Sequence, residues 1–485
     1  MRHVFPFALA ALLVLVISGG LSGALRAETV DAAFAELAPA PTSAQIRLIT
    51  DNHEAWYARW WVIANAKNTI DCTYFTVAND LVGESLIGAL LEKARQGVKI
   101  RMMVDARGSA SMQLSPFAKD YLPALLHYPN VEVRRYNAFG KELALVPAGI
   151  KAFIASDHAK MLIVDGQWVV AGGRNIMDHW FTSAQDDTES FHDVDFIAHG
   201  DGICEQAKAA FEDEYKALHT LPIKPHSPAA FEKASAHLEK VRSTMDGLIN
   251  GQIVPNDMQH ELTLFHSMTH YASFRPFADE STLPVMLLGK HSAASGHENP
   301  ITEHLLKVIN AATETIDVAH AYMVLTDKVK TALAAASARG VKIRYLTNSP
   351  ESTHSWMTQA RFVKEWKTYL RDVPSLRIFA LAFHHKLHGK MIVVDRRVSI
   401  LGSYNMDPMS ENINAEDVIV VDSPRFAAQA LSWMEEVQPE GIEYKIKIEA
   451  DGTLTQVVGP SDHCKASVLA LLKILGWFDF LRPLI

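Results

Sequence analysis

The sequence predicts an α/β fold of two pseudo-symmetric α/β/α lobes with mixed, mostly parallel sheets. A strand–helix–strand pattern occurs once in each half of the chain, and each helix ends at a glycine, as helices often do. A strand, a helix of about 15 to 20 residues and a second strand form a βαβ unit, which is typical of a parallel sheet covered by helices. At 485 residues, the chain is long enough for two or three domains, and each half can bury its own core.

The two halves correspond element by element. The predicted helix of the first half runs to Gly97, and its counterpart in the second half runs to Gly340. Apolar and β-branched residues predict the strands that flank each helix and one further strand after them. The predicted strands cover residues 68–75, 98–104 and 131–136 in the first half and residues 314–322, 341–346 and 376–381 in the second. This correspondence indicates an internal repeat.

These elements divide the chain into five segments. They are a signal peptide or N-terminal anchor at 1–27, a first lobe at 44–215, a connector at 216–283, a second lobe at 284–440 and a C-terminal tail at 441–485. An amphipathic piece at 229–249 predicts a partly helical connector, and a substrate-selecting cap over the cleft between the lobes is an alternative. Residues 466–485 carry few charges and many Leu, Trp and Phe, which fits either a core-docked helix or an interfacial helix resting on lipid.

The first residues predict export. A basic start at Arg2 precedes an apolar run at residues 5–17, and small residues follow, which is the pattern of a signal peptide. An uncleaved anchor is the alternative, because no Lys, Arg, Asp or Glu occurs between Arg2 and Arg26. In both cases we expect the catalytic part in the periplasm or at the outer face of the cytoplasmic membrane, or secreted.

A short motif occurs twice, 230 residues apart. The first copy begins His158-Ala-Lys160 and the second begins His388-Gly-Lys390, and each continues with four apolar residues and an aspartate. One copy alone would be weak evidence, but two copies with matching tails are far beyond coincidence. The repeat predicts one active site between the lobes, to which each half contributes a histidine and a lysine.

The tails of the two copies add further candidates. Asn175 and Asn405 each follow small residues that let the backbone approach a ligand, so we expect both to contact a substrate phosphate. Asp165 and Asp395 each stand between two apolar runs, at the position of a hairpin turn. This position favours a structural role in the turn for the two aspartates over contact with substrate.

This set of groups is suited to phosphodiester exchange. Residues two apart on a strand point to the same face, so two such strands would surround one anionic group with two imidazoles, two ammonium groups and two carboxamides. A phosphoryl-transfer transition state carries charge on its peripheral oxygens, and histidines on opposite sides of phosphorus can act as nucleophile and acid/base. No clustered carboxylate or His/Cys set lies beside the motifs, so we expect no metal and no other cofactor.

The motifs resemble the HKD signatures of the phospholipase D superfamily. The stretch from Gly402 to Ser410 with residues 412–416, and also residues 172–176, resembles the bacterial cardiolipin synthases. The resemblance covers roughly residues 45–440. It implies a catalytic set made of His158, Lys160, Asp165, His388, Lys390 and Asp395.

The resemblance also implies separate roles for the two histidines. His158 would form a covalent phosphohistidine, and His388 would protonate the leaving alcohol and then activate the incoming one. Asp193 and Glu416 match the downstream acids that orient the histidines through the second ring nitrogen. An insertion separates Asn175 from Asp193 in the first copy.

We therefore expect a phosphatidyltransferase that acts on membrane phospholipids and resembles cardiolipin synthase. A hydrolytic phospholipase D that releases phosphatidic acid is one alternative, and an exported nuclease or other phosphodiesterase is another. A net charge of −9 is unfavourable for holding many phosphates of a nucleic acid, so no nucleic-acid partner is expected. The expected partners are a phospholipid substrate and a membrane surface, and the expected state is a monomer.

Overall fold

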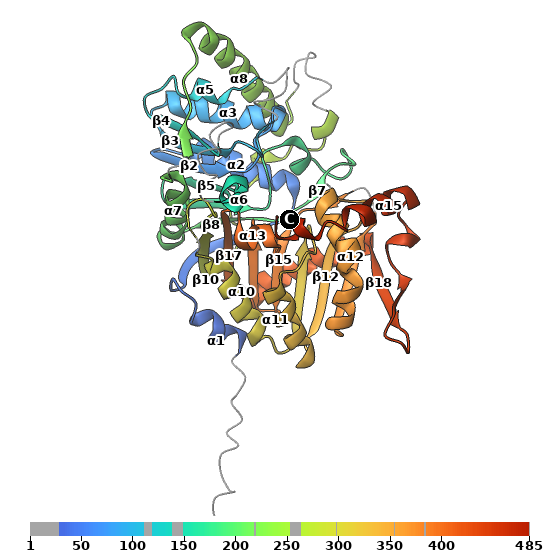
Figure 1. Cartoon of the computed structure of the whole chain (residues 1–485). Coiled ribbons are helices and arrows are strands. Elements are labelled where there is room, and N and C mark those ends of the chain that lie inside the picture. Colours follow the sequence, from blue (N-terminus) through green and yellow to red (C-terminus); the bar gives the residue numbers. More distant parts are fainter. Residues whose placement is uncertain are drawn as a thin grey trace, which may run out of the picture.

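The computed structural model describes residues 29–110, 119–137, 149–217, 220–252, 263–296, 298–353, 355–382 and 385–484. It consists of two α/β halves, which lie one above the other in Figure 1, the N-terminal half in blue to green and the C-terminal half in yellow to red. The segment 1–27, assigned above to a signal peptide or anchor, lies outside the described residues.

The first half contains the predicted strand–helix–strand unit. Strand β2 (Thr69–Tyr74) leads to α3 (Leu81–Arg95) and then to β3 (Lys99–Asp105). The Asp80 side chain caps α3 by accepting a hydrogen bond from a first-turn backbone N–H, and Gly97 follows the helix with φ +90°. The other elements of this half are α2 (Asn52–Asn65), α5 (Leu122–Leu125), β4 (Val131–Tyr136), α6 (Ile150–Ile154), β5 (Lys160–Val164), β6 (Trp168–Gly172), β7 (Phe191–His192), β8 (Asp195–His199) and α7 (Asp201–Tyr215). Helix α1 (Val30–Ala35) comes first in the chain but packs on the second half (Figure 1).

The second half repeats this order. Strand β11 (Thr315–His320) leads to α11 (Asp327–Ala338) and β12 (Lys342–Asn348), and Gly340 follows the helix with φ +93°. The other elements are α10 (Pro300–Ala311), α12 (Trp356–Asp372), β13 (Leu376–Leu381), β14 (Lys386–Leu387), β15 (Lys390–Val394), β16 (Val398–Gly402), α13 (Pro408–Asn412), β17 (Glu416–Asp422) and α14 (Pro424–Val437).

The strands of both halves join in one 17-stranded sheet. At its centre, β1 (Thr42–Ile49) pairs antiparallel with β10 (Thr282–Lys290), while β9 (Thr220–Pro222), β18 (Gly441–Ile448) and β19 (Leu454–Val458) lie toward its edges. The pairings run in the order β9-β4-β3-β2-β5-β6-β8-β1-β10-β17-β16-β15-β11-β12-β13-β18-β19. The order on one side of β1–β10 mirrors the order on the other, which confirms the pseudo-symmetry.

The prediction of mostly parallel sheets was wrong. Within the described part of the large sheet, the parallel pairings are β2–β3, β3–β4, β11–β12 and β12–β13, and the other pairings are antiparallel. The βαβ units account for the parallel pairings, as predicted. The motif strands β5 and β15, however, are each followed by a tight three-residue turn, which returns the chain antiparallel.

The hydrophobic core consists of three clusters. One lies under α2 and α3 in the first half, and a second lies under α10, α11 and α12 in the second half. The third cluster lies on the other face of the sheet, where Phe211 of α7 and Phe426 of α14 belong to one continuous apolar layer. Because this layer draws on both halves, burial of apolar surface holds them in one fixed arrangement.

The connector adds a helix to the first half, and the tail adds helices to the second half. The amphipathic piece forms α8 (Pro228–Ile249), which packs on α3 at the end of the molecule remote from the second half (Figure 1). This position gives no support for α8 as a cap over the cleft. The tail adds α15 (Ala466–Leu475) on α12 and a short 3₁₀ helix, η8 (Asp479–Leu484). No helix in the described ranges is long and apolar enough to span a membrane.

Candidate active site

Each motif lysine begins a buried strand of the sheet. Lys160 is the first residue of β5 and pairs with Tyr74 of β2, and Lys390 is the first residue of β15 and pairs with His320 of β11. Every residue of β5 and β15 is buried, as the apolar motif residues predict. The sheet therefore fixes the backbone on which the motif side chains stand.

Each motif histidine is held by an acid from the opposite half. Nδ1 of His158 lies 2.9 Å from Oε2 of Glu416, and Nδ1 of His388 lies 2.6 Å from Oδ2 of Asp193. Both carboxylates are fully buried, and the histidine side chains are only 12% and 5% exposed. This crossed pairing brings the two motifs into one site. Because each acid contacts Nδ1, the other ring nitrogen of each imidazole, Nε2, points away from the acid.

The backbone register shows that the two acids are equivalent. Gly172 pairs with Asp195 in the first half, and Gly402 pairs with Val418 in the second. Counting back two residues from each partner gives Asp193 and Glu416. The insertion in the first copy therefore lies in the loop before the acid and does not change its position in the sheet.

Different neighbours support the two acids. Glu416 accepts hydrogen bonds from the hydroxyls of Ser403 at 2.5 Å and Ser410 at 2.6 Å. Asp193 accepts one from the indole N–H of Trp180 at 3.0 Å. Gly173 takes the place of Ser403 in the first half, and a Cβ there would lie 2.0 Å from Oδ1 of Asp193, so only glycine fits. Sequence reasoning missed these supports, although both serines stand inside the second motif.

The lysine ammonium groups lie against the histidines. Nζ of Lys160 donates to the His158 carbonyl at 2.5 Å, and Nζ of Lys390 donates to the His388 carbonyl at 2.6 Å and lies 3.1 Å from its Nε2. The pKa of Lys390 is lowered to about 7, mainly because the ammonium group is buried. The charge of Asp193 raises this pKa, and the charge of Lys160 lowers it further. Burial also lowers the pKa of Lys160. The two ammonium groups repel each other in a site that an anion would neutralise.

The electrostatics of His158 favour its neutral form. Burial lowers its pKa most, Glu416 raises it and Lys160 and Lys390 lower it, and the net shift is downward. For Glu416, burial alone would raise the pKa, but its interaction with His158, the charge of Lys160 and the hydrogen bond from Ser403 together lower it. A neutral imidazole held by an ionised carboxylate is a competent nucleophile at neutral pH.

The motif asparagines are buried near the ends of the motif hairpins. Oδ1 of Asn175 accepts a hydrogen bond from the backbone N–H of Thr76 at 3.3 Å. Oδ1 of Asn405 is buried and has no hydrogen-bond partner among the residues that the structure describes. A buried amide oxygen without a partner costs about 1–3 kcal/mol, which fits a group that awaits a ligand.

The motif aspartates lie at the other end of their strands. The Asp165 carboxylate accepts hydrogen bonds from the backbone N–H groups of Lys67, Asn68 and Thr69, and Asp395 binds the corresponding turn at residues 313–315. Four residues lie between each lysine and its aspartate, so five steps of about 3.3 Å along the strand place the two about 16 Å apart. The structure supports the turn interpretation and gives no support for a catalytic role of Asp165 or Asp395.

Comparison with known proteins identifies the family. The family model described as cardiolipin synthase, PLD-like domain, matches residues 61–214 and 305–438, which together make up more than half of the chain. The chain belongs to this family. It is an enzyme of the phospholipase D superfamily, and each of the two matched ranges contains one HKD motif.

Bacterial relatives match this phospholipase D-like enzyme over most of its length. Cardiolipin synthase C of Escherichia coli is 26% identical over 405 residues, which cover 77% of the chain and 80% of the relative. Cardiolipin synthase A of Pseudomonas aeruginosa is 23% identical, covering 85% of the chain and 71% of the relative. The solved structure of phosphatidylserine synthase from Haemophilus influenzae shares the fold, with a TM-score of 0.62 at 13% sequence identity. The structural match covers 94% of this chain and 100% of the synthase chain.

Proposed function

We propose that this phospholipase D-like enzyme is a phosphatidyltransferase that joins two phosphatidylglycerol molecules into cardiolipin and releases glycerol. The observation that supports the proposal most is the crossed pairing of His158 with Glu416 and His388 with Asp193. It supplies two oriented imidazoles with two adjacent ammonium groups in one buried site. The similarity to cardiolipin synthases favours a lipid hydroxyl as the acceptor. One chain provides all of these groups, so a monomer suffices.

In the first half-reaction, Nε2 of His158 attacks the phosphorus of the donor lipid. The N–P bond forms as the bond from phosphorus to the glycerol head-group oxygen breaks. His388 donates its Nε2 proton to that oxygen, so glycerol leaves as the neutral alcohol. Lys160, Lys390 and the carboxamides of the two asparagines would balance the charge on the peripheral phosphate oxygens.

In the second half-reaction, His388 acts as the base. It removes the proton from the hydroxyl of a second phosphatidylglycerol, whose oxygen attacks phosphorus as the N–P bond breaks. His158 is thereby released as a free imidazole, and His388 regains its proton, so the cycle closes. If water takes the place of the lipid hydroxyl, the same steps produce phosphatidic acid.

The products of purified enzyme and labelled phosphatidylglycerol distinguish these outcomes. Cardiolipin and free glycerol in equal amounts would support the transferase, whereas phosphatidic acid as the main product would show a hydrolase. His158→Ala serves as the inactive control. A preparation that leaves phosphatidylglycerol unchanged while it cleaves DNA would contradict both lipid functions.

We expect the reaction to proceed without a metal ion at phosphorus. Each lysine ammonium group lies beside a motif histidine and can balance the phosphate charge that a divalent cation would otherwise neutralise. Turnover should persist in excess EDTA, measured while circular dichroism confirms that the protein is folded. Activity that disappears in EDTA and returns with Mg²⁺ would contradict this expectation.

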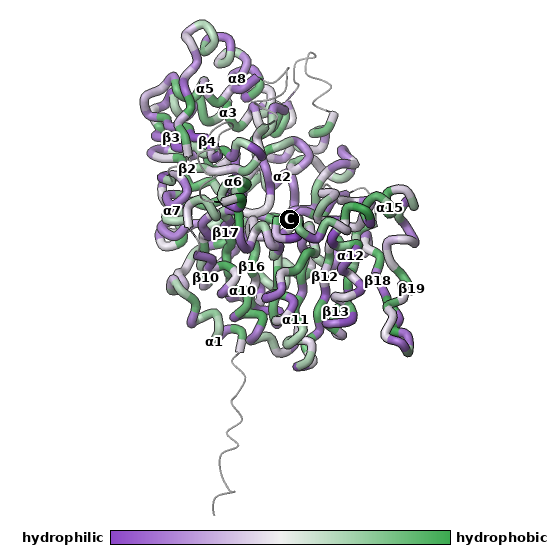
Figure 2. Tube along the Cα trace, in the orientation of Figure 1, coloured by the Kyte–Doolittle hydropathy of each residue, from purple (hydrophilic) through white to green (hydrophobic). Residues whose placement is uncertain are grey.

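A hydrophobic surface beside the site supports membrane attachment. Leu469 and Leu472 of α15 are buried on the protein, but Trp477, Phe478 and Phe480 are 79%, 45% and 72% exposed. Figure 2 shows the hydrophobic stretch along α15. The following helix η8 packs against α13, the helix that carries Ser410. We propose that these aromatic side chains enter the interface of the bilayer that provides the substrate, which combines the docked and the interfacial interpretations of the tail.

Removing these aromatic side chains should weaken membrane binding. Burial of a large apolar side chain is worth about 1.5–3 kcal/mol, so Trp477→Ala with Phe480→Ala should weaken binding to phosphatidylglycerol vesicles about 100-fold or more. Turnover of a soluble short-chain lipid should be unchanged. Ile448→Ala with Val457→Ala removes exposed apolar groups from β18 and β19 and serves as the control. Equal flotation of both double variants with vesicles would contradict the proposal.

We further propose that the enzyme works outside the cytoplasmic membrane, in the periplasm or on the outer face of that membrane. The apolar run at residues 5–17 with its small-residue end supports this location. An alkaline phosphatase fused after Thr42 should be active in cells, because that enzyme needs the oxidising periplasm for its disulfides. An inactive fusion at normal expression would refute export.

A further inference from the structure

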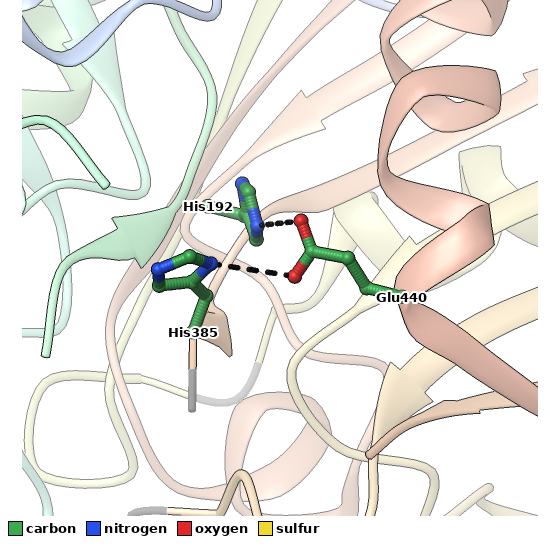
Figure 3. A group of neighbouring side chains, drawn as sticks. All are labelled: His192, His385 and Glu440. Carbon is green, nitrogen blue, oxygen red and sulfur yellow. Dashed lines mark hydrogen bonds and ion pairs between the residues drawn. The ribbon is translucent and has the colours of Figure 1, made fainter. Parts of the chain in front are cut away.

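A second group of titratable side chains lies outside the catalytic centre and also joins the two halves. His192 comes from β7 in the first half, while His385 and Glu440 come from the second half. Figure 3 shows the two imidazole rings on one side of the Glu440 carboxylate, to which both are joined. The proposed reaction uses none of these three residues.

The geometry of this group is close to that of a metal site. Nε2 of His192 lies 3.0 Å from Oε1 of Glu440, and Nδ1 of His385 lies 3.5 Å from Oε2. One ligand atom from each residue lies within 4.8 Å of the other two. Ligand atoms around a tetrahedral zinc ion are about 3.3 Å apart, because each is about 2.0–2.1 Å from the metal. Small side-chain rotations would therefore bring all three onto one ion.

The surroundings favour a cation over a simple ion-pair cluster. Oε2 of Glu440 is buried, and its contact with Nδ1 of His385 at 3.5 Å is an ion pair without hydrogen-bond geometry, so its lone pairs are only partly used. The three side chains keep 22–27% of their surface exposed, which leaves room for entry of an ion and for a fourth, water ligand.

We propose that His192, His385 and Glu440 bind a divalent transition-metal ion of the zinc class, which fastens the two halves together beside the active site. Two imidazoles and one carboxylate form a ligand set that zinc accepts readily, whereas Mg²⁺ and Ca²⁺ prefer oxygen ligands. The ion is not part of the phosphoryl transfer, so the proposal is compatible with turnover in EDTA.

The position of the site links the ion to His388. The carbonyl of His192 accepts hydrogen bonds from the backbone N–H groups of His388 at 2.7 Å and Gly389 at 3.1 Å. The next residue, Asp193, orients the His388 ring. Strands β7 and β14 pair at this point, with His192 opposite Leu387. A bound ion would fix the segment that carries the proposed acid/base against the segment that carries its orienting acid.

Metal binding to the full-length protein tests this proposal directly. Titration with Zn²⁺ should show one site per chain that Glu440→Gln and His385→Ala weaken at least tenfold. The pair His237–Glu84 has the same residue types 2.6 Å apart but is not part of such a cluster, so His237→Ala and Glu84→Gln are matched controls and should bind like the unchanged protein. Unchanged affinity in Glu440→Gln and His385→Ala, or equal losses in the controls, would overturn the proposal.

A second measurement covers variants that fold poorly. Co²⁺ should give the visible absorption of a four-coordinate nitrogen–oxygen site in the unchanged protein and lose it in His385→Ala. Zn²⁺ should raise the Tm of the unchanged protein relative to EDTA, because a ligand that binds only the folded state stabilises it. The same Tm with Zn²⁺ and EDTA, measured on folded protein, would also overturn the proposal.

Discussion

Replacing His158 by alanine should abolish both the covalent intermediate and turnover. The neutral imidazole of His158 is held at Nδ1 by Glu416, and its Nε2 is the proposed nucleophile. His388→Ala should lower turnover of natural lipid by about a thousandfold, because an unprotonated glycerol alkoxide is a poor leaving group. The second variant retains the nucleophile, so its defect should depend on the leaving group.

A nitrophenyl ester separates the two histidines, because nitrophenolate leaves without protonation. With this substrate, His388→Ala should form phosphohistidine on His158 and stall, since no base activates the acceptor. Mass spectrometry without acid treatment would locate the adduct. His237→Ala, which changes a histidine on the outer face of the first half, is the control and should turn over normally. An adduct formed readily on His388 in His158→Ala would reverse the assignment.

Neutralising the orienting acids should have the second-largest effect. In the serine-protease triad, replacing the buried aspartate by asparagine lowers kcat about 10⁴-fold because the imidazole takes the wrong tautomer. We expect Glu416→Gln and Asp193→Asn to lower turnover by about 10²–10⁴-fold for the same reason. Asp193→Asn should affect natural lipid more than the nitrophenyl ester, because Asp193 orients the histidine that protonates the leaving group.

The pH dependence of kcat/KM in the Glu416→Gln variant should show which histidine Glu416 orients. Glu416 raises the pKa of His158, so its neutralisation should lower that pKa further. The nucleophile must be unprotonated, so the acid limb of kcat/KM for the nitrophenyl ester should move to lower pH while the plateau falls. Glu84→Gln should leave the profile unchanged. A shift to higher pH, or equal losses on both substrates for Asp193→Asn, would contradict these roles.

The internal repeat made much of the fold predictable. Each predicted strand from 68–75 to 376–381 overlaps an observed strand, because local burial patterns and helix-ending glycines act over short distances. The error concerned strand direction. The parallel pairings of the βαβ units were correctly expected, but the antiparallel pairings of β1 with β8 and β10 depend on contacts more than 100 residues apart in sequence.

The candidate site was predictable where the motif itself carries the chemistry. His158, Lys160, His388 and Lys390 stand where two strands of the sheet begin, and the register places Asp193 and Glu416 at equivalent positions. The support by Trp180 was not predictable, because an indole that reaches a carboxylate 13 residues later leaves no periodic signal in the sequence.

The sequence alone indicated the two matching histidine–lysine motifs, the repeated βαβ units and the turn positions of Asp165 and Asp395, because each depends on local sequence patterns. Only the tertiary structure decided that each histidine pairs with the acid of the other half, since that choice depends on how the two halves pack. The same packing brought His192 together with His385 and Glu440, which are separated by about 190 to 250 positions in the sequence. Long-range burial of the shared apolar layer, which has no local signature, fixes both arrangements.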